Sequence, residues 1–84
     1  MTLRLQPVRV ATGSYDIDGQ LVFADGFLTA VLVKLSGYHE DMAGMWFLEA
    51  GFGWVDTPTR PTFADLDAAQ TWIEEQLARG LSPH

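Results

Sequence analysis

Alternation of apolar and polar residues dominates the first two thirds of the chain and predicts β-strands. Four runs show this pattern, at about residues 3–11, 20–24, 27–36 and 45–55. The run at 27–36 is apolar at odd and even positions alike, which is typical of a central strand covered on both faces. In the last run, strict alternation puts one set of apolar residues on a single face: Trp46, Leu48, Ala50, Phe52 and Trp54.

The first run changes phase near its middle. Leu3 and Leu5 occupy one set of alternate positions, whereas Val8 and Val10 occupy the other. The change falls at Pro7, a residue that cannot donate a hydrogen bond to a neighbouring strand. We therefore expect a bulge or break at this point and a place at the edge of the sheet.

Two Asp-Gly pairs, at 18–19 and 25–26, suggest either a calcium loop or hairpin turns. An EF-hand loop needs glycine at its sixth position and glutamate at its twelfth. Loops that start at Asp16 or Asp18 place large apolar residues or a threonine there. Asp-Gly between β-prone runs instead favours tight hairpins. The sequence predicts turns, with Asp25-Gly26 the favoured hairpin because a longer strand follows it.

Helical periodicity replaces the alternation at about residues 63–79. Thr62 is the expected cap, and Gly80 is expected to end the helix. One apolar stripe follows from the spacing: Phe63, Leu66, Ala69, Ile73 and Leu77, widened by Trp72. The sequence thus predicts one α+β domain over residues 1–84, with an antiparallel β-meander of three to four strands packed against one C-terminal helix, a two-layer β-β-β-α arrangement.

Composition narrows the class of protein. The chain has 84 residues, of which 48% are hydrophobic, and it contains no cysteine, so disulfides and thiolate sites are excluded. Eleven acidic residues outnumber five scattered basic ones for a net charge of −6, and we therefore do not expect nucleic acid as a partner. No apolar run is long enough to span a membrane, and Arg4, Gln6 and Arg9 interrupt any signal-peptide core. The expected location is cytoplasmic, with no membrane contact.

No motif for catalysis or cofactor binding is complete. His39-Glu40 could begin a zinc motif, but Ala43 stands where the second histidine would be. Gly51-Phe52-Gly53 resembles part of a dinucleotide fingerprint, but Asp56 occupies the position of the third glycine. GxSxG and P-loop patterns do not occur. We predict a protein that is not an enzyme and that has no cofactor and no metal site.

An excess of apolar residues is the feature that points to a function. The chain holds ten aromatic residues, and one helix can cover only one face of a sheet. Apolar residues left exposed on the second face would form an interaction surface. Alternatively, the first strand and the loop at 37–44 wrap that face. The expected interaction residues are Leu28, Leu32, Phe47, Trp46 and Trp54.

The segment PTFADLDAAQTWIEEQL resembles the helix that closes many small β-β-β-α domains, an outline shared by arm-type DNA-binding domains of phage-like integrases. The resemblance implies a nucleic-acid-associated module, although the strands expected at 20–36 and 45–55 carry a single basic residue, Lys34. The preferred hypothesis is a non-enzymatic interaction domain that forms a homodimer or binds a protein partner. The nucleic-acid module is one alternative, and a small-ligand binder with an aromatic cleft near Trp46, Trp54 and Tyr38 is another.

Overall fold

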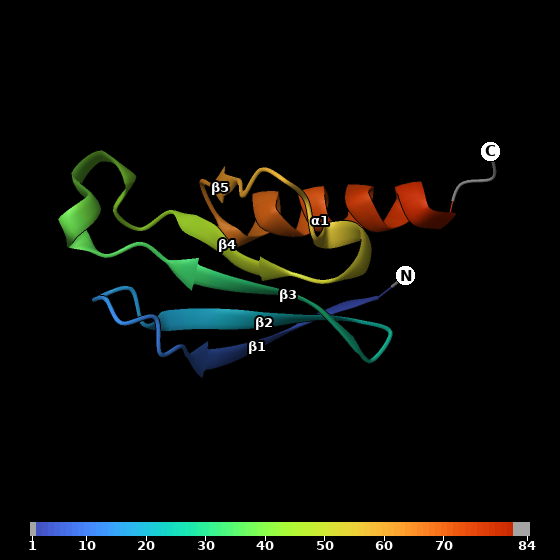
Figure 1. Ribbon diagram of the computed structural model, residues 1–84, viewed down its shortest axis with the longest axis horizontal. Helices are drawn as coiled ribbons and strands as arrows, with labels where there is room; N and C mark the ends of the chain where they lie inside the picture. The colour runs from blue at the N-terminus through green and yellow to red at the C-terminus, as the bar shows by residue number, and fades with distance from the viewer. Residues whose placement is uncertain (1, 82–84) are drawn as a thin grey trace.

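The computed structural model describes residues 2–81, which form an antiparallel sheet with one helix packed on it (Figure 1). The strands are β1 (Leu3–Arg9), β2 (Asp18–Ala24), β3 (Phe27–Lys34), β4 (Trp46–Gly51) and β5 (Thr62–Phe63). Short 3₁₀ segments η1 (Gly37–Met42) and η2 (Gly53–Val55) follow β3 and β4, and the helix is α1 (Leu66–Leu81). The sheet order is β1-β2-β3-β4-β5, so the expected α+β meander with a C-terminal helix is confirmed.

The two Asp-Gly pairs have different roles. Asp25 and Gly26 close the β2–β3 hairpin with φ values of 51° and 89°, as a tight turn of this type requires. The expected turn at Asp18-Gly19 is wrong, because both residues lie inside β2. A Cβ at Gly19 would lie 2.7 Å from the carbonyl oxygen of Leu32 and 2.8 Å from a methyl carbon of Val10, so glycine is needed here because the backbone of β3 and a neighbouring side chain come close.

The edge strand β1 is continuous. Its pairing with β2 runs from Leu3 to Arg9 without a shift in register, so the bulge expected at Pro7 is wrong, whereas the edge position is confirmed. The change of apolar phase has another cause. Leu5 packs against the core beneath α1, whereas Val8, three residues later, faces the opposite side of the sheet. The two ends of one strand therefore serve two different apolar surfaces.

Two bulges interrupt the alternation in the central strands. Val22 pairs with Ala30 but Phe23 pairs with Leu28, which leaves Thr29 as an extra residue in β3. The Thr29 hydroxyl donates a hydrogen bond of 3.0 Å to the Val22 carbonyl, which satisfies a backbone acceptor where the ladder is disturbed. A second register shift leaves Glu49 as the extra residue in β4. Each bulge reverses the face on which the following side chains lie.

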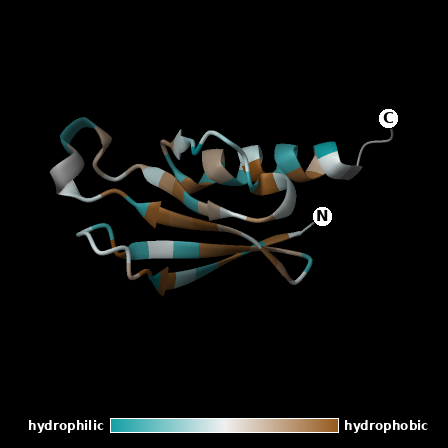
Figure 2. Ribbon diagram, viewed as in Figure 1, coloured by the Kyte–Doolittle hydropathy of each residue, from teal (hydrophilic) through white to brown (hydrophobic). Residues whose placement is uncertain are grey.

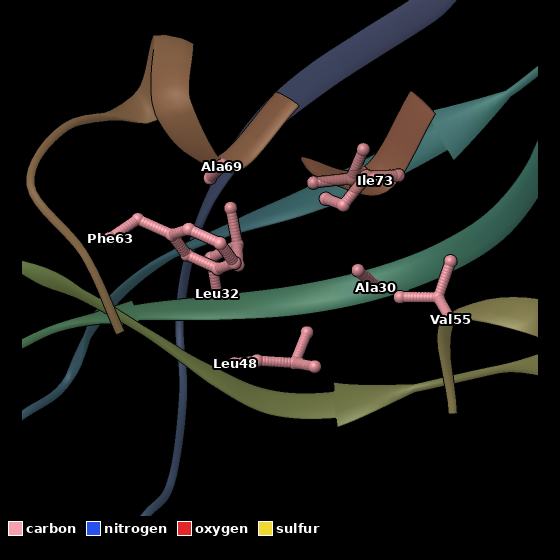
Figure 3. Packing of buried hydrophobic residues seen from close by; sticks show 8 residues of the cluster. Ala30, Leu32, Leu48, Val55, Phe63, Ala69 and Ile73 are labelled. Atoms are coloured by element: carbon pink, nitrogen blue, oxygen red, sulfur yellow. The ribbon is translucent and has the colours of Figure 1, made fainter. Parts of the chain in front are cut away.

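The core lies between α1 and one face of the sheet. Figure 3 shows Ala69 and Ile73 of α1 directed toward Ala30 and Leu32 of β3, with Phe63 beside them. The apolar stripe expected on the helix is confirmed from Leu66 onward, because these members belong to this core or pack against it. Phe63, the expected first member, also lies in the core but belongs to β5. Among residues 2–81, no helix combines the length and apolar character that a membrane span requires.

The ends of the helix differ from those expected. It begins at Leu66, because Thr62, the expected cap, lies in β5 and pairs with β4. Asp65 is the cap instead, since its Oδ1 accepts a hydrogen bond of 2.8 Å from the Ala68 N–H. The helix also continues through Gly80, where it was expected to stop.

Gly80 makes room for an indole ring. A Cβ at this position would overlap Nε1 of Trp54, which approaches the last turn of α1 from η2. We expect Gly80→Ala to change the free energy of unfolding by less than about 1 kcal/mol, because the higher helix propensity of alanine opposes the displacement of the ring. Tryptophan emission should move to longer wavelength as Trp54 swings into solvent. A Trp54→Phe background provides the control, and a red shift that persists in it would contradict this account.

Candidate functional site

The sheet face opposite α1, called the open face below, is assembled from three rows of paired residues on neighbouring strands. These rows follow from the strand register and consist of Arg4, Phe23 and Leu28; Gln6, Leu21, Val31 and Ala50; and Val8, Gly19, Val33, Phe47 and Thr62. Its middle row is apolar on three of four strands. The face thus presents a broad apolar surface on the side of the sheet away from the core.

The middle of the open face is only partly buried. Leu21, Phe23 and Val31 are half-buried, and Leu28 is 37% exposed. Within residues 2–81, no other helix or strand lies over this part of the sheet (Figure 1). Figure 2 shows that the central strand β3 is hydrophobic along most of its length, as expected of a strand that supplies apolar side chains to both faces.

One end of the open face is covered by loops. Val33 and Leu35 are 1% and 8% exposed, although α1 lies on the other side of the sheet. Met42 from η1 lies against this end, together with Phe47 and with Thr12, Ser14 and Asp16 of the β1–β2 loop. The loop at 37–44 therefore contributes to the cover at this end through Met42, as the alternative expected, but the β1–β2 loop takes the place of the first strand, and the middle stays accessible.

Between these loops and the sheet is an open pocket of about 280 Å³. Its apolar lining comes from Val33, Leu35, Met42 and Phe47. Three hydroxyl residues, Thr12, Ser14 and Thr62, and two acidic residues, Asp16 and Glu49, complete the lining. The pocket joins residues from the β1–β2 loop, β3, η1, β4 and β5, so strand pairing and loop packing together create it.

Hydrogen bonds hold the β1–β2 loop in place beside the pocket. The Thr12 hydroxyl donates to the Asp16 carbonyl at 3.0 Å and accepts from the Ser14 N–H at 3.2 Å. Asp16 Oδ1 in turn accepts from the Ser36 N–H at 2.6 Å, which ties this loop to the end of β3. The local Thr and Ser bonds form a turn, so the rim does not depend on helix or strand pairing for its shape.

Charge is confined to the margins of the open face. At the β1 edge, the Arg4 guanidinium lies 4.7 Å from the ring centroid of Phe23, within the range of a cation–π interaction. Near the opposite edge, Glu49 lies in β4 and lines the pocket. The face therefore has a cation at one side, a carboxylate at the other, and apolar residues between them.

The structure separates the residues expected to form an interaction surface. Leu28 and Phe47 lie on the open face. The expectation for Leu32 is wrong: the residue is 0% exposed in the core beneath α1, because the extra residue Thr29 puts it on the opposite face from Leu28. Trp46 likewise packs against the core, so it does not contribute to the open face.

The expected aromatic cleft is not formed in the described part of the chain. Trp46 packs on the core near Phe63, whereas Trp54 is 58% exposed beside the last turn of α1. The side chain of Tyr38 lies outside the described residues. The bulge at Glu49 is one cause, since it ends the alternation that put Trp46 and Trp54 on one face.

Sequence reasoning missed the pocket residues Thr12, Ser14, Asp16 and Glu49. Asp16 is prominent in the sequence as the first residue of a possible calcium loop, and no pattern in the sequence singles out Glu49. The phase change in β1 was the available signal, because it places Val8 on a second apolar surface beside the loop that follows. Among residues 2–81, no group of three or more histidine, aspartate or glutamate side chains is arranged to hold a metal ion.

The basic residues are spread over several elements. Arg4 and Arg9 belong to β1, Lys34 ends β3, Arg60 lies in the connector before β5, and Arg79 lies in the last turns of α1.

Comparison of the chain with protein-family models, with curated proteins and with solved structures gives no match. Any functional conclusion must therefore come from the open face and its pocket.

Proposed function

We propose that this chain is a non-enzymatic interaction domain that forms a reversible homodimer through its open face. The observation that carries the proposal is the apolar surface around Leu21, Val31 and Leu28, which neither α1 nor the loops bury. Burial of one large apolar side chain contributes about 1.5–3 kcal/mol. A second sheet stacked face to face, as in a β-sandwich, is the simplest arrangement that removes such a surface from water.

The charges at the margins favour a second copy as the occupant. With a two-fold axis parallel to the strands, the β1 edge of one copy lies over the β4 edge of the other. This arrangement puts Arg4 of each copy at the same margin as Glu49 of the other, offset by two to three residues along the strands, and the two interactions are equivalent by symmetry. The apolar middle rows then meet each other across the interface.

The size of the face indicates a weak dimer. Four strands spaced about 4.8 Å apart, each about seven residues long with a rise of about 3.3 Å, give a face of roughly 19 by 23 Å. Because loops cover one end of each face, two such faces bury at most roughly 900 Å², which is below the size of most stable interfaces. We therefore expect a reversible dimer with a dissociation constant in the micromolar range.

Sedimentation equilibrium from about 5 to 500 μM tests the proposal. The mean mass of the wild-type protein should rise from that of the monomer toward twice that value. Leu28→Lys should remain monomeric, because it places a charge within the apolar contact. Phe27→Lys is the matched control: the residue is adjacent and 77% exposed, but it lies on the other side of the sheet and should leave dimerisation intact.

Charge reversal tests the arrangement of the two copies. Arg4→Glu and Glu49→Arg should each weaken the dimer, and the double variant should restore it, since the pair is re-formed with opposite polarity. A wild-type protein that stays monomeric at every concentration would exclude the homodimer. A dimer that Leu28→Lys leaves unchanged would place the contact elsewhere.

A further inference from the structure

The lining of the pocket beside the open face favours a positively charged ligand over a negatively charged one. Its volume of about 280 Å³ is just below the range of about 300–1,000 Å³ typical of pockets for drug-sized ligands, so its occupant is small. Both ionisable residues in the lining, Asp16 and Glu49, are acidic. An anion that enters this pocket is repelled by these two carboxylates and by the net charge of −6 on the whole chain.

The buried side of the pocket is apolar and favours a ligand that carries a hydrocarbon portion. Val33 and Leu35 are almost completely buried and supply aliphatic surface, and Phe47 adds an aromatic ring. Met42 is 40% exposed at the mouth, where its flexible side chain can adjust to the shape of the occupant. A small molecule with a short hydrocarbon portion would remove both its own apolar surface and that of the buried side of the pocket from water.

The rim supplies acceptors for a cationic donor. An ammonium group has three N–H donors and no acceptor, and hydroxyl and carboxylate oxygens can accept from it. Thr62 offers a hydroxyl oxygen, and Glu49 offers a carboxylate. Within the described residues, no salt bridge or side-chain hydrogen bond engages that carboxylate, since the Arg60 guanidinium donates to the backbone carbonyl of Glu49 instead.

We propose that this pocket binds a small organic cation, in which a primary ammonium group is carried on a short alkyl chain. The alkyl chain lies on Val33, Leu35 and Phe47, and the ammonium group lies at the rim near Glu49. The loop that supplies Thr12 and Asp16 is already held by its own hydrogen bonds and by the contact with Ser36, so binding requires little ordering of the protein. This site shares Glu49 with the proposed dimer contact but lies apart from the apolar contact around Leu28, so a bound cation and the Arg4 of a second copy would compete for the same carboxylate.

Methyl-detected NMR with three ligands of equal length provides the test. The wild-type protein is titrated with n-butylammonium, with n-butyrate and with 1-butanol, and the methyl signals of Val33, Leu35 and Met42 are followed. n-Butylammonium should shift these signals in a saturable manner, with a dissociation constant at least about tenfold lower than that of n-butyrate. 1-Butanol should fall between the two, because it keeps the alkyl contact and lacks the charge.

Variants locate the contact. Glu49→Gln keeps the size of the side chain and should weaken n-butylammonium about fivefold, with little effect on 1-butanol. Glu75→Gln removes an exposed carboxylate on α1, away from the pocket, and should leave every affinity unchanged. Equal affinity for the cation and the alcohol, or an unchanged affinity in Glu49→Gln, would overturn the proposal, as would shifts at methyl groups remote from the pocket.

The same titration in Leu28→Lys separates this inference from the proposed function. The variant removes the dimer contact, and it should bind n-butylammonium at least as well as the wild-type protein does. Binding in a protein that never dimerises would support the pocket while excluding the homodimer. If the protein dimerises but its pocket methyl groups do not respond to n-butylammonium, the homodimer is supported and the cation site is excluded.

Discussion

Leu32→Ala is expected to lower the free energy of unfolding by about 3–4 kcal/mol, a large share of the stability of a domain this small. The side chain is 0% exposed and lies in the core between β3 and α1, with Leu48 on the adjacent strand and Ile73 on the helix. Its truncation leaves a cavity that the paired backbone of β3 cannot close. Urea unfolding followed by circular dichroism measures the loss.

Leu28→Ala is the matched control, since it makes the same change in the same strand. Leu28 is 37% exposed on the open face, so its truncation should cost less than about 1 kcal/mol in the monomer. Unfolding at low protein concentration keeps dimerisation from contributing. Equal losses in the two variants would mean that both side chains share one face, in which case the bulge at Thr29 does not exist.

Much of the fold follows from local sequence signals. Asp25 and Gly26 both tolerate positive φ, so the hairpin could be predicted from these two residues and the β-prone runs on either side of them. The helical stripe of which Ile73 is the centre was equally readable, because only one face of α1 is apolar. These features depend on residues close together in the chain, and their local preference agrees with the final structure.

The errors concern features that neighbouring strands impose. No local signal marks Thr29 or Glu49 as an extra residue, because a bulge is defined by the partner strand against which the residue is left unpaired. Asp18-Gly19 has the composition of a turn, but the pairing of both residues with β1 and of Gly19 with β3 makes them strand positions. Thr62 resembles a helix cap until pairing with β4 draws it into the sheet.

The same distinction applies to the candidate site. An uncovered apolar sheet face could be inferred from the count of apolar residues against one helix, and Leu28 was placed on it correctly. The pocket could not be inferred, because Thr12, Met42 and Glu49 come from three segments that only the folded sheet brings together. The phase change around Pro7 reflects the two apolar surfaces of the sheet: the apolar residues at one end of β1 face the core, and those at the other end face the side covered by loops.

Gly51→Ala is expected to destabilise the protein by about 3 kcal/mol, although it adds only one methyl group. Gly51 ends β4, and η2 then turns the chain so that Val55 enters the core at 0% exposure. A Cβ at Gly51 would overlap the carbonyl oxygen of Val55, lie 2.7 Å from its carbonyl carbon and lie 3.1 Å from the Asp56 nitrogen. All three obstacles are backbone atoms, so no side-chain rotation can relieve the clash.

Gly37→Ala is the control for this substitution, because a Cβ at Gly37 has nothing within 4 Å and the residue does not have a positive φ. Its stability should lie within about 0.5 kcal/mol of that of the wild-type protein. The expected cost at Gly51 arises from displacement of Val55, so Gly51→Ala should also increase hydrogen exchange at the Val55 amide, which donates to the Phe52 carbonyl at 3.2 Å. A Gly51→Ala protein as stable as Gly37→Ala would show that η2 does not pass against the end of β4, and the route by which Val55 reaches the core would have to be revised.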